Sequence, residues 1–233
     1  MMKWIHLKSD IKQMKREPIM LLFAFLSLLL IGLFKVIIIF GIPLLKKMTG
    51  FDLLTYEGDV LALVYLLQPF MLGTVIGFFM LDEKDQKIFE LLRVTPLGLN
   101  GYLVNRLLMP IALVIVYTSI AYFTLGQGLH LLIWLLPIIL MLCLQTIVIG
   151  LFIAIVSEDK VKGLTYSKAV SGLMVFAFVH LMPIPWLQTL AKIVPQYYVS
   201  QMILSPSIVM MVAGLCVHSL WLFVMMNLAL RKL

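Results

Sequence analysis

Six long apolar segments alternate with short polar connections along the chain. A transmembrane helix needs roughly 20 predominantly apolar residues, each adding about 1.5 Å along the helix axis. The candidate segments are residues 19–45, 60–81, 102–125, 131–156, 169–182 and 207–229. The pattern predicts an all-α integral membrane protein with six transmembrane helices, formed by a single membrane domain over residues 1–233.

The composition supports this class of protein. Of the 233 residues, 63% are hydrophobic and only 12% are charged, whereas the surface of a soluble domain must be largely polar. The net charge of +7 would suit a nucleic-acid-binding protein if the cations formed one basic face. They lie instead in short runs between apolar segments, so we expect contact with membrane lipids and not with nucleic acid.

The distribution of these cations predicts the orientation of the chain in the membrane. Fourteen of the 18 Lys and Arg residues lie in the N-terminal tail, the second-to-third connection, the fourth-to-fifth connection or the C-terminus. Only Lys46, Lys47 and Lys192 fall on the other side, and Lys35 lies inside the first segment. Because cytoplasmic loops are enriched in Lys and Arg, both termini and the loop around Glu83 are expected to be cytoplasmic.

Residues 1–18 have a helical periodicity of their own. Trp4, Leu7, Ile11 and Met14 are spaced by three or four residues, and basic residues occupy the opposite face. This pattern is typical of an amphipathic helix that lies in the inner membrane interface, and Pro18 would end it. A disordered basic tail that only sets the topology is the alternative.

The densest cluster of charge lies in residues 82–96, DEKDQKIFELLRVTP. Ile88, Leu91 and Leu92 form an apolar stripe at helical spacing, and Thr95-Pro96 would terminate the helix. Acidic residues are expected at the start of this helix, where its dipole favours them, and they are Asp82, Glu83 and Asp85. The sequence therefore predicts a short amphipathic helix outside the bilayer, which either occupies a groove on a partner or lies on the inner membrane surface.

Four prolines between residues 183 and 206 exclude one continuous span there. Short helices at membrane depth persist only when they are buried in protein or held at the interface. Trp186, Tyr197 and Tyr198 in this segment fit an aromatic belt at the outer membrane surface.

Polar side chains are rare inside the predicted spans. Lys35 lies near enough to the outer face for its ammonium group to snorkel to the interface, and a contact with a transported substrate is the alternative. Gln68 and Gln145 are expected to hydrogen-bond neighbouring helices or, alternatively, to line a substrate path. The abundance of apolar side chains would suit a hydrophobic or amphipathic cargo.

No motif for catalysis or metal binding is present. The four histidines lack the HExxH spacing of intramembrane metalloproteases. Cys143 and Cys216 lie in apolar segments without companions at metal-ligand spacing. The chain also lacks a GxxxxGK[ST] loop to hold nucleotide phosphates, so an energy source for pumping would have to lie on another subunit. We therefore expect no enzyme activity and no cofactor in this chain.

The segment around residues 82–106 resembles the cytoplasmic segment of type-2 ATP-binding-cassette (ABC) exporter permeases, particularly compact bacterial drug-export members. The matching residues are Asp82, Glu83, Glu90, Leu92, Thr95, Pro96, Leu97, Tyr102, Leu103 and Arg106. The resemblance extends along most of the chain, including the N-terminal helix, the six spans and the proline-rich outer segment.

This resemblance implies a multi-pass permease subunit in a bacterial inner (cytoplasmic) membrane. It implies that residues 82–96 contain a coupling helix that docks on a cytoplasmic ABC ATPase subunit, where ATP and Mg bind. It also implies a dimer with a second, identical or paralogous permease, and short outer helices around residues 183–206 that close the path. The cargo would be a drug, lipid or peptide, exported by alternating access.

The main alternative function is that of a secondary transporter or channel-like protein without an ATPase partner. Such proteins normally place charge inside the membrane to couple or select ions. Only Lys35 could serve here, which disfavours this alternative.

Overall fold

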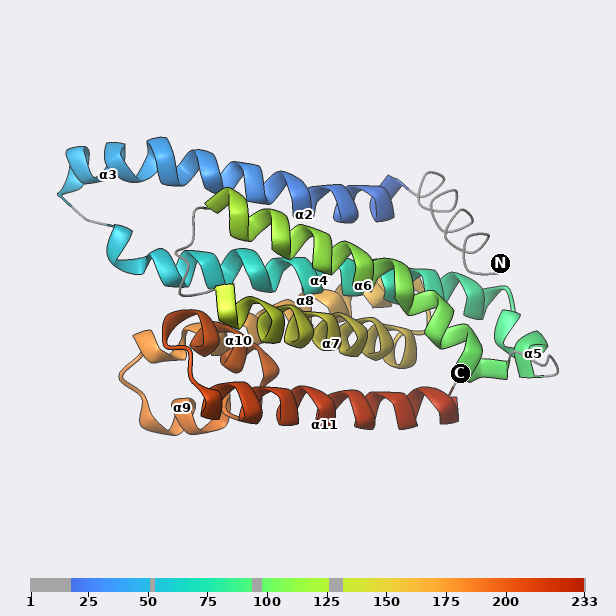
Figure 1. Cartoon of the computed structure of the whole chain (residues 1–233). Coiled ribbons are helices and arrows are strands. Elements are labelled where there is room, and N and C mark those ends of the chain that lie inside the picture. Colours follow the sequence, from blue (N-terminus) through green and yellow to red (C-terminus); the bar gives the residue numbers. More distant parts are fainter. Residues whose placement is uncertain (1–17, 51–52, 94–97, 126–131, 233) are drawn as a thin grey trace.

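A computed structural model describes the chain except for residues 1–17, 51–52, 94–97, 126–131 and 233. The expected N-terminal interfacial helix therefore lies outside the described residues, apart from Pro18. The same is true of Thr95 and Pro96. Within the described residues every regular element is helical and there is no strand (Figure 1).

Six helical stretches are long and apolar enough to cross a membrane, which confirms the prediction of six spans. The first comprises α2, a π-helical turn and α3, and the fifth comprises α8 followed by a 3-10 helix. Their bounds are α2 Pro18–Val36, the π-helical turn Ile37–Gly41, α3 Ile42–Thr49, α4 Glu57–Asp85, α6 Gly98–Leu125, α7 Leu132–Val156, α8 Lys160–Gly172, the 3-10 helix Leu173–Leu181, and α11 Ile208–Lys232.

Several spans extend further than the apolar pattern predicts, among them the second and the fifth at the end of the molecule that carries α5 (Ile88–Arg93). The second was expected to end at residue 81, but α4 continues to Asp85. The fifth was expected to begin at residue 169, but α8 begins at Lys160 because the Asp159 side chain accepts a hydrogen bond from the Lys162 backbone N–H at 2.8 Å. Such an N-cap satisfies one of the otherwise unpaired donors of the first turn. Helical structure thus continues beyond the hydrophobic limits of both spans.

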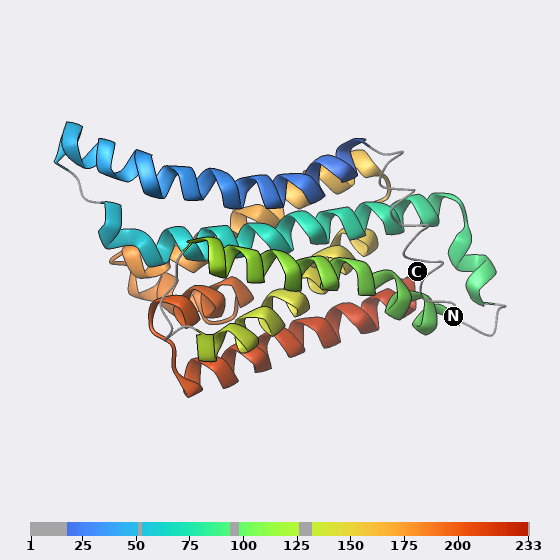
Figure 2. The ribbon, with the colours of Figure 1, turned by 45° about the horizontal axis from the view of Figure 1, so that its top comes forward.

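Helices α4 and α7 form the centre of the bundle. Figures 1 and 2 show α2 on one side of them and α11 on the other. α6 crosses α4 obliquely in Figure 1 and contacts α2, α4 and α7. Most side chains in the middle of α4 and α7 are buried, whereas few of those in the first and last spans are buried. The exposed apolar faces of the peripheral spans would face lipid in a membrane.

Glycines allow α4 and α7 to approach closely. A Cβ atom at Gly73 would lie 2.8 Å from Ile149 Cβ, and one at Gly77 would lie 2.7 Å from Ile153 Cβ. From the other side, a Cβ atom at Gly150 would lie 3.2 Å from the Gly73 backbone oxygen. Small residues four apart are the usual means by which membrane helices pack backbone to backbone.

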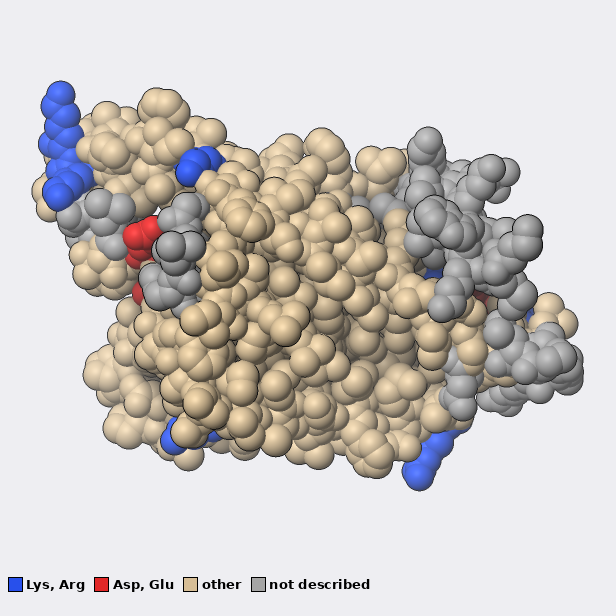
Figure 3. All heavy atoms as spheres, in the orientation of Figure 1, with Lys and Arg blue, Asp and Glu red and all other residues tan. Residues whose placement is uncertain are grey.

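The two ends of the bundle differ. The start of α2, the end of α11 and the short helix α5 lie at one end, and α3, α9 (Pro185–Ala191) and α10 (Pro195–Leu204) lie at the other (Figure 1). In Figure 3 the charged side chains lie toward these two ends, and the broad middle of the visible face carries none. This distribution matches a membrane-spanning protein, since charge is costly within the hydrocarbon layer.

The proline-rich outer segment forms two short helices, α9 and α10, as expected from its sequence. α9 is largely exposed. α10 is inserted among α4, α7, α11 and the 3-10 helix, and seven of its residues from Pro195 to Ile203 are buried. This burial satisfies the requirement that a non-spanning helix at membrane depth be enclosed by protein.

Candidate functional site

The segment between α4 and α6 contains the predicted short helix, α5 (Ile88–Arg93). A two-residue turn precedes it, in which Lys87 adopts a positive φ of 56°. The prediction that Asp82, Glu83 and Asp85 begin this helix is wrong, because all three lie in the last turns of α4. Acids near a helix C-terminus oppose the helix dipole, and cationic partners on neighbouring elements offset that cost here.

One side of α5 is anchored by a residue that the apolar stripe did not include. Phe89 is only 4% exposed and packs edge-on against Tyr102, with 5.3 Å between ring centroids. Leu92 is partly buried in the same cluster. Leu91 points away and is 64% exposed, and Glu90 is exposed beside it. The residues of the predicted stripe therefore differ in environment: Leu92 packs against the bundle, whereas Leu91 is exposed at the surface.

A buried ion pair joins α4 to α6 next to this anchor. Arg106 Nη2 lies 2.9 Å from Glu83 Oε1, and the two side chains are 6% and 14% exposed, respectively. The Tyr102 hydroxyl donates a hydrogen bond to the same carboxylate. The Arg106 guanidinium also lies over the Phe79 ring, 4.3 Å from its centroid. These contacts couple the end of α4 to the start of α6, on either side of α5.

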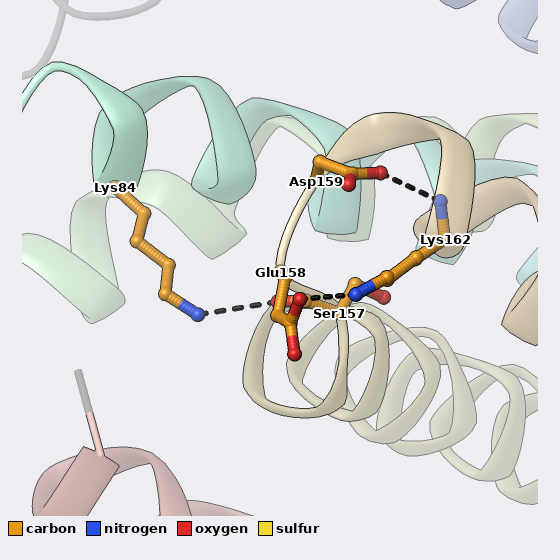
Figure 4. Close-up of polar contacts among 5 residues, drawn as sticks. All are labelled: Lys84, Ser157, Glu158, Asp159 and Lys162. Carbon is orange, nitrogen blue, oxygen red and sulfur yellow. Dashed lines mark hydrogen bonds and ion pairs between the residues drawn. The ribbon is translucent and has the colours of Figure 1, made fainter.

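Polar contacts also attach the α7–α8 turn to the end of α4 (Figure 4). Lys84 Nζ donates to the Ser157 backbone oxygen at 3.2 Å, and Lys160 Nζ lies 2.7 Å from Asp82 Oδ1. Within the turn, Glu158 pairs with Lys162 at the surface. The sequence predicted that Lys84, Lys160 and Lys162 are cytoplasmic cations, but their pairing depends on which helices become neighbours.

The polar residues expected within the spans have different environments. Lys35 lies in the last turn of α2 and is half-buried. Gln68 is buried in α4 and its Oε1 accepts a hydrogen bond from Thr118 Oγ1 of α6 at 2.9 Å. Gln145 is buried in α7, but neither of its amide atoms has a hydrogen-bond partner among the described residues. Gln145 lines a pocket instead.

The three outer aromatic residues do not form one cluster. Trp186 is exposed on α9. Tyr197 and Tyr198 lie on α10 with 5.2 Å between ring centroids, and the Tyr198 hydroxyl donates to the Lys192 backbone oxygen at 2.9 Å. Burial, with a smaller contribution from Tyr197, raises the pKa of Tyr198, so this hydroxyl stays a donor. Whether the residues form a gate or an aromatic belt stays a prediction.

Comparison with known proteins assigns the chain to a family. Residues 10–226 match the model of a family described as "Fluoroquinolones export permease protein Rv2686c-like". The chain belongs to this family. The resemblance to compact bacterial drug-export permeases, carried by the segment around α5, is thereby confirmed.

Two similar proteins carry the same kind of name. They are the fluoroquinolones export permease protein MT2760 of Mycobacterium tuberculosis strain CDC 1551 / Oshkosh and the fluoroquinolones export permease protein Rv2686c of strain ATCC 25618 / H37Rv. Each is 26% identical to this chain over 171 residues, which cover 72% of this chain and 67% of the relative. Membership of the Rv2686c-like permease family, together with six membrane-spanning helices, makes this chain a multi-pass membrane protein of the transporter class.

Proposed function

We propose that this chain is the transmembrane permease subunit of an ATP-driven ABC exporter for planar aromatic drugs such as fluoroquinolones. Family membership and the names of the two relatives support the cargo class. ATP and Mg would bind to a separate cytoplasmic ATPase subunit. A second permease, identical or paralogous, would complete the membrane unit, with both termini of each chain in the cytoplasm.

One structural observation carries the proposal. α5 extends beyond the ends of the spans and presents Leu91 and Glu90 outward, while Phe89 fixes it to the bundle. An exposed apolar side chain on a rigidly held helix is suited to a groove on a soluble partner. In this role α5 is the coupling helix and Leu91 is its docking residue.

The contacts around α5 would transmit a displacement of this helix to α4 and α6. A displacement of α5 would be transmitted through Phe89 and Tyr102 to α6, and through the Glu83–Arg106 pair to α4. α4 extends to the opposite end of the bundle, where it contacts α10. Docking and release of the ATPase would therefore shift the outer helices, as alternating access requires. Lys35, Trp186, Tyr197 and Tyr198 would lie along this outer part of the path.

Leu91→Asp tests this proposal with little effect on folding, because the side chain is mostly exposed. Burial of an unpaired carboxylate in an apolar groove costs several kcal/mol, and a cost of about 3 kcal/mol weakens binding at least a hundredfold. We expect loss of the ATPase during co-purification from the native membrane, with unchanged permease levels. Leu92→Asp would be less informative because Leu92 also packs inside the bundle.

Leu91→Met is the matched control, since it keeps an apolar side chain of similar volume. It should retain the ATPase and drug export. Glu90→Ala should have a milder effect than Leu91→Asp, because a charge at the rim of an interface mainly changes the association rate. Full ATPase binding by the Leu91→Asp protein would show that α5 is not the docking element.

A further inference from the structure

A partly open pocket of about 190 Å³ lies between α7, α8, α10 and α11, near the middle of the spans. Its walls are mostly apolar and include Val148, Phe152, Val170, Trp221 and Met225. The indole Nε1–H of Trp221 donates to the Ile193 backbone oxygen at 3.0 Å. This hydrogen bond fixes the indole ring, so the pocket has a rigid aromatic wall.

Two buried amides line this apolar space. Gln145 is 1% exposed, and neither its Nε2 nor its Oε1 has a partner among the described residues. Gln196 is 4% exposed, and its Oε1 also has no such partner. Buried polar groups are nearly always hydrogen-bonded, and an unpaired one is unfavourable. These amide atoms make up almost none of the pocket surface, so a ligand that offers both an acceptor and a donor would satisfy them once the two side chains rotate toward it.

The N-terminus of α10 adds a further attraction for an acceptor. Val194, Pro195 and Gln196 line the pocket, and the N-cap residue Val194 has no side chain able to cap the helix. Pro195 has no N–H, and the Tyr197 N–H already donates to the Val194 backbone oxygen at 3.3 Å. The attraction therefore comes mainly from the helix dipole, which makes this end partially positive. A carbonyl or carboxyl oxygen placed here would interact with the helix end and with the Gln145 N–H groups.

We infer that this pocket binds a flat aromatic molecule that carries a carbonyl or carboxyl oxygen and a neighbouring N–H or O–H donor. The size supports one or two fused rings, because an apolar cavity of about 150 Å³ is known to bind benzene. No charged residue is among the described residues that line the pocket, so recognition depends on the amides, the helix end and the aromatic wall. The identification of this molecule as export cargo rests on the proposed function.

The test uses the full-length chain in lipid nanodiscs and two labelled probes, nalidixic acid and naphthalene, measured by equilibrium dialysis. Both probes have two fused aromatic rings, but only nalidixic acid carries carbonyl and carboxyl groups. Gln145→Leu should weaken nalidixic acid binding at least tenfold and leave naphthalene binding unchanged. Its thermal midpoint should be unchanged or higher, since an unpaired amide is replaced by an apolar side chain.

Two further variants separate the pocket from general effects on folding. Met225→Trp adds bulk in the pocket and should weaken the binding of both probes. Gln68→Leu removes another buried glutamine of the spans, one that bonds Thr118 and does not line the pocket, so it should leave both affinities unchanged.

Unchanged nalidixic acid binding in both Gln145→Leu and Met225→Trp would overturn the inference. The inference would also be overturned if Gln145→Leu lowered only the thermal midpoint, because a structural water would then occupy the site. It would likewise be overturned if Met225→Trp altered only the oligomeric state, because a second copy of the chain would then cover the pocket. These outcomes leave the proposed function standing, because ATPase binding through Leu91 is measured separately. Conversely, probe binding without any ATP-dependent export would refute the proposed function and not the pocket.

Discussion

Replacement of Arg106 by Met should destabilise the end of the bundle that carries α5. The substitution leaves the Glu83 carboxylate, which is 14% exposed, without the guanidinium 2.9 Å away. Removal of one partner from a buried ion pair costs about 3–5 kcal/mol. The Tyr102 hydroxyl still donates to this carboxylate and the methionine can still pack on Phe79, so we place the cost at the lower end, about 3 kcal/mol.

The thermal midpoint of the purified permease provides the assay. For a chain of 150–250 residues, 1 kcal/mol corresponds to a change of about 2–4 °C in Tm. A cost of 3 kcal/mol therefore predicts a decrease of roughly 6–12 °C. The double variant with Glu83→Gln should recover part of this loss, because no uncompensated charge then stays buried.

Glu158→Ala is the matched control. Glu158 pairs with Lys162 on the same end of the molecule, but both side chains are exposed. Exposed pairs contribute little to stability, so its Tm should not change measurably. A change in Tm for Arg106→Met no larger than that of Glu158→Ala would refute the reasoning that burial makes the Arg106 pair important.

Two further predictions concern the packing and the topology. Gly77→Val should lower the free energy of unfolding by about 1–3 kcal/mol through overpacking, because its Cβ would contact Ile153. Gly172→Val should change Tm little, because the space around its Cβ position is open. Equal Tm values for the two variants would contradict the close α4–α7 contact. In intact cells, a membrane-impermeant thiol reagent should label Gln188→Cys and not Asp85→Cys, and the reverse pattern would overturn the proposed orientation.

The sequence alone was sufficient to predict the class of protein, the six spans and the existence of a short helix between the second and third spans. Each of these depends on local composition, since the thickness of the hydrocarbon layer sets how many apolar residues a helix needs. The short outer helices follow in the same way from the prolines, which exclude a continuous span whatever surrounds them.

The periodicity of the sequence could not decide which residues of α5 pack against the bundle and which are exposed at the surface. Phe89 and Leu91 are both apolar, and the spacing of Ile88, Leu91 and Leu92 suggested a single outward stripe. The tertiary structure buries Phe89 against Tyr102 and leaves Leu91 exposed. A helical pattern identifies residues that share a face, but the elements packed around the helix decide which face is buried.

The ion pairs and the pocket could not be predicted from the sequence either, because both depend on which helices pack together. Glu83 and Arg106 are 23 positions apart, and their pairing requires α4 and α6 to be neighbours at that depth. In the sequence, Gln68 and Gln145 are both isolated glutamines inside apolar segments. In the structure, Gln68 is hydrogen-bonded to Thr118, whereas Gln145 lines the pocket and has no hydrogen-bond partner among the described residues. Local composition determines that a helix spans the membrane, whereas its neighbours and the small residues that let them approach determine which polar side chains find partners.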